Sequence, residues 1–257
     1  MIEGLETFLN QYRQTSNDNW LAGLIENQWF AVDWPAEYGG PDVTRQQKLN
    51  LVKELAHAGC PLWPESVTVI APLLLNLGSE KEKQTSLPSI LVSPQDWLLE
   101  IEDATLVIQH GSQRIRLGGP GDSDMHLATC VSPLFQIHSL VTSLARIDDM
   151  TSHWGEEADS DVTELNILLS SLEVMYLQDD PRKDLQIALM TNRAEFQSYS
   201  LLFQLLGYYA LLDPDPVQTD NEYIPFSKER DHLCRLRRHV GRNDMVQQDR
   251  LYEEYLD

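Results

Sequence analysis

The sequence is short of positive charge. Its 257 residues contain 19 lysines and arginines against 40 aspartates and glutamates, which gives a formal net charge of −21 at pH 7. Proteins that bind nucleic acid do so mainly by neutralising its phosphates with basic side chains, and anionic membranes attract basic segments in the same way. The charge balance therefore excludes nonspecific binding to nucleic acid and disfavours a membrane surface as partner.

Cysteines and long apolar runs are also scarce. Cys60, Cys130 and Cys234 are far apart and form no C-x-x-C pair, so we expect neither a disulfide framework nor a thiolate zinc site, and we interpret them as small buried apolar residues. No stretch approaches the roughly 20 apolar residues of a membrane span. Because the acidic start Met1–Gly4 also lacks the features of a signal peptide, we expect a cytoplasmic protein.

Apolar residues at helical spacing dominate both ends of the chain. Capping boxes at Thr44–Gln47 and Ser79–Glu82 predict two helix starts, and Gly59 predicts the end of the first of these helices. Further helices are predicted over residues 2–12 and 20–25, from near Pro133, over Leu165–Tyr176, and from Pro181 to about Leu212. Both ends are therefore predicted to be helical.

A β-prone segment separates the two helical regions. Residues 104–108 and 114–117 predict a hairpin, and Gly118–Asp124 has the composition of a linker. The expected fold class is therefore mainly α. It comprises an amino-terminal helical domain over residues 1–97, a short β-hairpin and linker over 98–132, and a carboxy-terminal helical bundle over 133–257.

Several segments of the first hundred residues occur together in one known family. Trp29–Pro41, Glu54–Pro61, Ala71–Gln84, and Leu87–Leu91 followed by Trp97 resemble, in order and spacing, the amino-terminal helical domain of acyl-CoA dehydrogenases. Ala188–Leu212 is similar to the long helix of that family's carboxy-terminal four-helix domain. The resemblance implies two helical domains that flank an antiparallel β-domain, which in the family helps to hold FAD and the acyl-CoA.

The middle of the chain is too short for that β-domain. Leu98–Ser132 provides 35 residues, whereas six or more strands with their loops need on the order of 60. The segment also lacks the Thr-Glu-Pro and Gly-Ser-Asp sequences by which the family lines its flavin and substrate. We therefore predict a member of the family that lacks most of the barrel.

The family's catalytic glutamate has no clear counterpart. It removes an α-proton from the acyl thioester, beside a Gly-Gly-Thr-like turn near the carboxy terminus, while the flavin takes the β-hydride. The nearest match is Val240–Gln247, where Gly241 stands at the position of the base. Asp244 is the only carboxylate nearby, and its shorter side chain would need a shifted loop to reach a substrate. We therefore assign no catalytic and no cofactor-binding residue.

Basic residues are concentrated in one segment, Lys228–Arg242. It contains six lysines and arginines, namely Lys228, Arg230, Arg235, Arg237, Arg238 and Arg242, and two acidic residues. The resemblance implies one use for them, because related enzymes contact FAD phosphates across a subunit interface with carboxy-terminal arginines, whose forked geometry suits phosphate. The alternative is a basic helix that the protein's own acidic surface neutralises. FAD is thus expected only at an interface with a partner.

Two groups of possible metal ligands do not predict a metal site. His232, Cys234 and His239 do not share one helical face and lack a fourth ligand. The second group has no EF-hand spacing and suits a solvated loop between helices; it comprises Asp148, Asp149, His153, Glu156, Glu157, Asp159 and Asp161. The aromatic residues Phe196, Tyr199 and Phe203 are interpreted as core and interface packing.

Three hypotheses of function follow. The first is a non-catalytic acyl-CoA dehydrogenase-like subunit, the partner or scaffold of a complete flavin-dependent acyl-CoA dehydrogenase in a homo- or hetero-oligomer. The second is a minimal FAD-dependent dehydrogenase that oxidises a CH–CH bond, with FAD at a subunit interface and a non-standard base. The third is an acidic, homo-oligomeric binding module. Bound flavin separates the second hypothesis from the first, and a co-purifying complete relative separates the first from the third.

Overall fold

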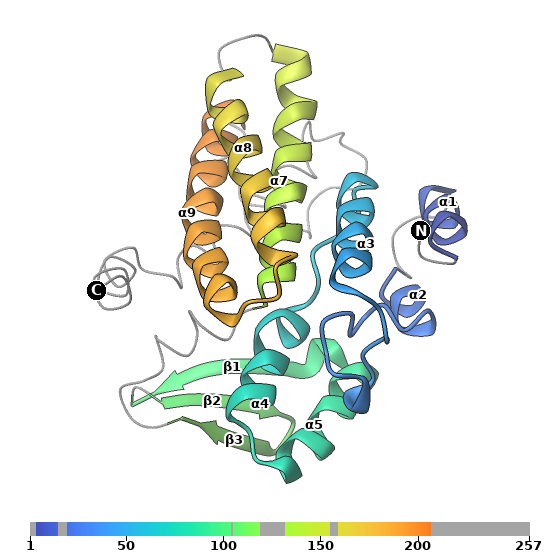
Figure 1. Cartoon of the computed structure of the whole chain (residues 1–257). Coiled ribbons are helices and arrows are strands. Elements are labelled where there is room, and N and C mark those ends of the chain that lie inside the picture. Colours follow the sequence, from blue (N-terminus) through green and yellow to red (C-terminus); the bar gives the residue numbers. More distant parts are fainter. Residues whose placement is uncertain (1–3, 15–19, 104, 119–131, 155–158, 207–257) are drawn as a thin grey trace, which may run out of the picture.

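The chain folds into an amino-terminal group of helices, a small sheet and a bundle of long helices (Figure 1). The computed structural model describes residues 4–14, 20–103, 105–118, 132–154 and 159–206. The amino-terminal helices are α1 Leu5–Gln14, α2 Trp20–Glu26, α3 Arg45–His57, α4 Ala71–Leu77 and α5 Glu80–Val92, with short helical turns at Ala36–Tyr38, Ser66–Ile70 and Pro94–Asp96. The bundle consists of α7 Pro133–Trp154, α8 Asp159–Tyr176 and α9 Pro181–Leu206.

Both predicted capping boxes are confirmed. The Thr44 hydroxyl accepts a hydrogen bond from the Gln47 amide at 3.3 Å, and the Gln47 side chain accepts one from the Thr44 amide at 2.9 Å. Ser79 and Glu82 form the same pair of bonds at the start of α5. Gly59, with φ +76°, follows the end of α3 as expected. These caps satisfy amide groups that the first turn of a helix leaves unpaired.

The sheet has three strands, one more than the predicted hairpin. β2 Thr105–His110 and β3 Gln113–Leu117 form the predicted hairpin, and β1 Trp97–Glu102 pairs antiparallel with β2 to give the order β1-β2-β3. The expectation of a hairpin alone was therefore wrong by one strand. The sequence pattern does not predict β1, because WLLEIE does not alternate strictly between apolar and polar residues. One face of the sheet, with Trp97, Ile108 and Ile115, belongs to the main hydrophobic core.

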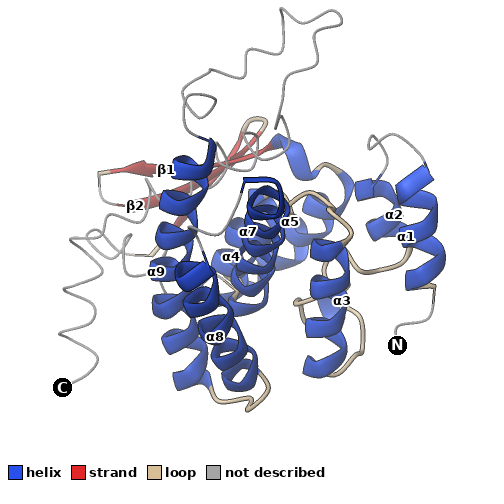
Figure 2. Ribbon diagram, turned by 90° about the horizontal axis from the view of Figure 1, so that it is seen from above, coloured by secondary structure: helices blue, strands red, loops and turns tan. Residues whose placement is uncertain are grey.

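The two helical parts contact each other directly. α7 lies at the centre, where it packs against α8 and α9 on one side and against α3 on the other (Figure 2). Eleven consecutive residues of α7, from Leu134 to Leu144, are buried, a pattern typical of a helix surrounded by others. The sheet sits beside α4 and α5 at one end of this assembly (Figure 1). Within the described ranges, none of the helices is long and apolar enough to cross a bilayer.

Candidate functional site

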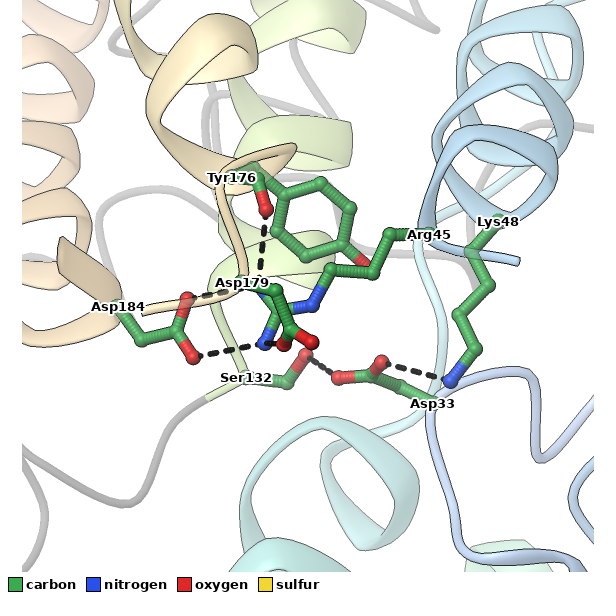
Figure 3. Close-up of polar contacts among 7 residues, drawn as sticks. All are labelled: Asp33, Arg45, Lys48, Ser132, Tyr176, Asp179 and Asp184. Carbon is green, nitrogen blue, oxygen red and sulfur yellow. Dashed lines mark hydrogen bonds and ion pairs between the residues drawn. The ribbon is translucent and has the colours of Figure 1, made fainter. Parts of the chain in front are cut away.

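A cluster of charged and polar side chains joins the two helical parts, and we call it the polar junction (Figure 3). It connects the loop after α2, the start of α3, the start of α7 and the turn between α8 and α9. Its members are Asp33, Arg45, Lys48, Ser132, Tyr176, Asp179 and Asp184.

Arg45 is the centre of the junction. Its guanidinium donates to the backbone carbonyl of Tyr176 at 2.8 Å and to both carboxylate oxygens of Asp184 at 3.0 and 3.1 Å. It also pairs with the exposed Asp179 at 2.8 Å and lies 4.9 Å from the centre of the Tyr176 ring. Bidentate pairing fixes orientation as well as distance. The first turn of α3 is thereby held at the end of α8.

Asp33 forms the second half of the junction. Its carboxylate pairs with Lys48 at 3.4 Å and accepts a hydrogen bond from the Ser132 hydroxyl, so it connects the loop, α3 and the residue before α7. Burial raises the pKa of Asp33, although Lys48 and the Ser132 bond oppose the rise. The pKa of Asp33 therefore depends on how well Lys48 and Ser132 replace the water that burial removes.

The loop that carries Asp33 is fixed by its neighbours. Trp34 is buried, and the Tyr38 hydroxyl donates to Glu80 of α5 at 3.0 Å, so both residues hold the loop in place. A Cβ atom at Gly40 would overlap the carbonyl oxygen of Trp34. Only glycine allows this close approach of two backbone segments. These contacts fix the loop, and the loop in turn holds Asp33 in place between α3 and the start of α7.

The junction is built to hold helices rather than to perform chemistry. Its carboxylates face cations or a hydroxyl, and Arg45 and Lys48 are both engaged. Burial raises the pKa of the Tyr176 hydroxyl, so this group stays protonated. A general base needs a free carboxylate or imidazole within reach of a substrate. We therefore interpret the junction as a structural connection.

The described strands of the small sheet lack a surface that could hold FAD. Its inner face is packed into the core, and its outer face carries ion pairs between β3 and β1: Arg114 pairs with Glu102 and, at 3.8 Å, with Glu100, and Arg116 pairs with Glu102 at 3.4 Å. A flavin ring needs an apolar surface and hydrogen-bond donors that are not already engaged. The described residues of this sheet do not fit FAD.

The remaining predicted site residues are separated or lie outside the described ranges. Asp148 and Asp149 are in α7 and Asp161 is in α8, so they do not form a loop, and the described residues hold no grouping suited to a metal ion. Cys60 is buried as expected. The other calls lie outside the described residues: Cys130, Glu156, Glu157, the segment Lys228–Arg242 with His232, Cys234 and His239, and the turn with Gly241 and Asp244.

Sequence reasoning missed the polar junction, although one signal was present. Helix dipoles favour acidic side chains in the first turn and basic ones in the last, yet α3 begins with Arg45 and Lys48 and has no acidic residue there. A reversed charge at a well-capped helix start indicates a partner elsewhere in the fold. The sequence could not predict which residue is that partner, because Arg45 and Asp184 are 139 positions apart.

Comparison with known proteins agrees with the resemblance. Residues 5–93 match the family model for the acyl-CoA dehydrogenase N-terminal domain. The chain is 32% identical over 81 residues to the acyl-CoA dehydrogenase FadE26 of Mycobacterium tuberculosis (strain ATCC 25618 / H37Rv); the match covers 32% of this chain and 19% of that protein. This chain therefore spans about a fifth of the length of that curated relative.

Two solved structures share the overall fold of this chain. Butyryl-CoA dehydrogenase from Megasphaera elsdenii superimposes with a TM-score of 0.58 at 11% identity, over 100% of this chain and 98% of that one. The ChsE4–ChsE5 complex from Mycobacterium tuberculosis gives a TM-score of 0.50 at 14% identity, over 97% and 96%. Residues 5–93 of this chain thus match one domain of acyl-CoA dehydrogenases, and the predicted mainly α fold is confirmed.

Proposed function

We propose that this chain is a non-catalytic acyl-CoA dehydrogenase-like subunit that acts as partner or scaffold of a complete, flavin-dependent acyl-CoA dehydrogenase. One observation carries the proposal: α3 and α7 pack directly on each other and are joined by the polar junction, while the described residues between α5 and α7 form a three-stranded sheet and one short helical turn. The chain keeps the helical surfaces of the family and has little of the domain that holds its cofactor.

The ion pairs on the sheet support this proposal. An isolated half of a barrel would expose the apolar side chains that normally face the second sheet. Here Glu100, Glu102, Arg114 and Arg116 cover the outer face instead. Charged side chains are also a common device that keeps an exposed sheet from pairing with other chains. β1 and β3 are therefore suited to remain the edge strands of this sheet, rather than to pair with strands of another subunit in a barrel.

A heteromeric arrangement is consistent with the fold comparison, since one of the solved structures with this fold is a complex of two proteins, ChsE4 and ChsE5. A complete partner would supply FAD, the substrate pocket and the catalytic base, and this chain would supply helical contacts. Its role would be to stabilise the assembly or to shape its surface.

Isolation of the tagged full chain from its own host, followed by native mass spectrometry, tests the proposal. We expect a stoichiometric complex with a larger acyl-CoA dehydrogenase, with FAD bound to the larger subunit. FAD retained by the purified chain alone, together with reduction of a dye by an acyl-CoA, would contradict it and favour the minimal dehydrogenase. Isolation of the chain without any such relative would favour the binding module.

A further inference from the structure

A groove opens between α8 and α9, at the end of the bundle where α8 begins and the described part of α9 ends (Figure 1). Its floor is apolar, because Leu165 of α8 and Leu201 of α9 are buried, and Phe196, which is 39% exposed, lines the same groove. Its volume of about 190 Å³ is below the roughly 300–1,000 Å³ of pockets that enclose small ligands. The groove therefore suits one or two side chains of a polypeptide better than a separate small molecule.

The rim of the groove on the α8 side is acidic. Asp161 and Glu164 line it, both are exposed, and they lie one turn apart on the helix. Neither carboxylate forms an ion pair with any residue that the structure describes. An apolar floor beside free negative charge is matched by an occupant that is both basic and amphipathic.

The segment Lys228–Arg242 has this chemistry. It contains six basic and two acidic residues in a chain whose net charge is −21. Leu233, Leu236 and Val240 follow one another at intervals of three and four residues, which is the spacing of one helical face. In the same spacing, Arg237 lies next to this apolar face. An amphipathic helix commonly binds by placing such a face in an apolar groove.

The segment can reach the groove within its own chain. Gln204 lines the groove and lies two residues before the end of α9 at Leu206. Positions 207–227 separate Leu206 from the segment and can span up to roughly 70 Å when extended, which is far more than this short distance requires. A tethered segment also has a high effective concentration at a site near its tether, whereas two copies that each carry a charge of −21 repel each other.

We propose that the segment Lys228–Arg242 binds in the groove between α8 and α9 of its own chain. Leu236 and Val240 contact the apolar floor, and Arg237 pairs with the acidic rim at Glu164. The most basic part of the sequence is then neutralised within the chain. This contact does not depend on the partner role proposed above.

Limited proteolysis of the purified full chain with thermolysin, which cleaves before leucine, tests the proposal at Leu233 and Leu236. When a protected site opens and closes quickly, the cleavage rate follows the population of the open form. We expect cleavage at least 10-fold slower than in a synthetic peptide of residues 228–242. The rate should be the same at micromolar and at tens of micromolar protein, because the contact lies within one chain.

Charge reversal tests the pairing. Glu164→Arg and Arg237→Glu should each accelerate cleavage of the segment about 10-fold, because each change brings like charges together. The double variant Glu164→Arg/Arg237→Glu should restore protection. Glu37→Arg, the same charge change at an exposed position in the short turn Ala36–Tyr38, is the matched control and should leave the cleavage rate unchanged.

Each outcome decides a separate point. Cleavage as fast as in the peptide would overturn the proposal, as would protection that Glu164→Arg and Phe196→Ser leave unchanged. Protection that increases with protein concentration would assign the segment to a second copy and overturn a contact within one chain. Failure of the double variant to recover, while circular dichroism shows that each variant is folded, would overturn the pairing of Arg237 with the rim. Recovery would support it, since a second charge reversal does not repair a destabilised fold.

Discussion

Removal of the Arg45 guanidinium should weaken the connection between the two helical parts. Arg45→Met keeps the apolar stem beside Tyr176 and deletes the bonds to the Tyr176 carbonyl and to Asp184. A hydrogen bond from a charged donor contributes about 1.5–3 kcal/mol, and a partly exposed ion pair contributes up to about 1 kcal/mol. Because such contributions are not additive, we expect a loss of about 3 kcal/mol in the free energy of unfolding.

Urea denaturation followed by circular dichroism measures this loss, and thermal unfolding should show a decrease of about 6–12 °C. Lys53→Met is the matched control, because Lys53 also connects α3 to α8 but makes a single ion pair, with Glu173. It should cost about 1 kcal/mol or less. Equal losses in the two variants, or an Arg45→Met protein within 0.5 kcal/mol of the parent, would refute the view that the junction holds the helical parts together.

Further predictions concern the loop and two buried titratable groups. Gly40→Ala should destabilise the protein by about 2 kcal/mol or more through overlap with the Trp34 carbonyl, whereas Ala36→Gly, at an exposed position in the same loop, should cost less than about 1 kcal/mol in the same urea assay. Burial lowers the pKa of His138 from 6.5 to about 3, so the unfolded chain takes up a proton at a higher pH than the folded protein. The free energy of unfolding should therefore fall by up to about 1.4 kcal/mol for each pH unit below pH 6.5. His138→Gln should remove this dependence in denaturation series at pH 7, 6 and 5, and an unchanged dependence would contradict the burial of a neutral His138. The raised pKa of Asp33 has the opposite effect on stability, because the folded state keeps the proton to a higher pH than the unfolded chain does. The free energy of unfolding should therefore decline as pH rises above about 4, and Asp33→Asn should lack that decline.

Local signals in the sequence predicted much of the fold. The boxes at Thr44 and Ser79 and the stop at Gly59 act within a few residues, so the sequence pattern and the structure agree there. The long helices of the bundle follow from apolar spacing over many turns. β1 was not predicted because its sequence WLLEIE does not alternate strictly between apolar and polar residues, and its pairing with β2 depends on the tertiary fold.

The polar junction could not be predicted from the sequence, for a physical reason. Its bonds join positions that are 99 residues apart for Ser132 and Asp33 and 131 residues apart for Arg45 and Tyr176. Spacing rules describe one helix or one turn and contain no information on how two helices meet. The exposure of Phe196 and Phe203 has the same origin: their period fits a helix, but which side of α9 is covered depends on α7 and α8.

Native mass spectrometry of the protein isolated from its own host tests whether the chain is a flavin-free partner subunit, because one experiment gives the masses of the chain, its partners and any bound flavin. We expect a subunit of 29.4 kDa without flavin, in a defined ratio with a heavier acyl-CoA dehydrogenase subunit that carries FAD. A 29.4 kDa subunit that itself retains FAD after its neighbours are stripped away in the gas phase would contradict the proposed role.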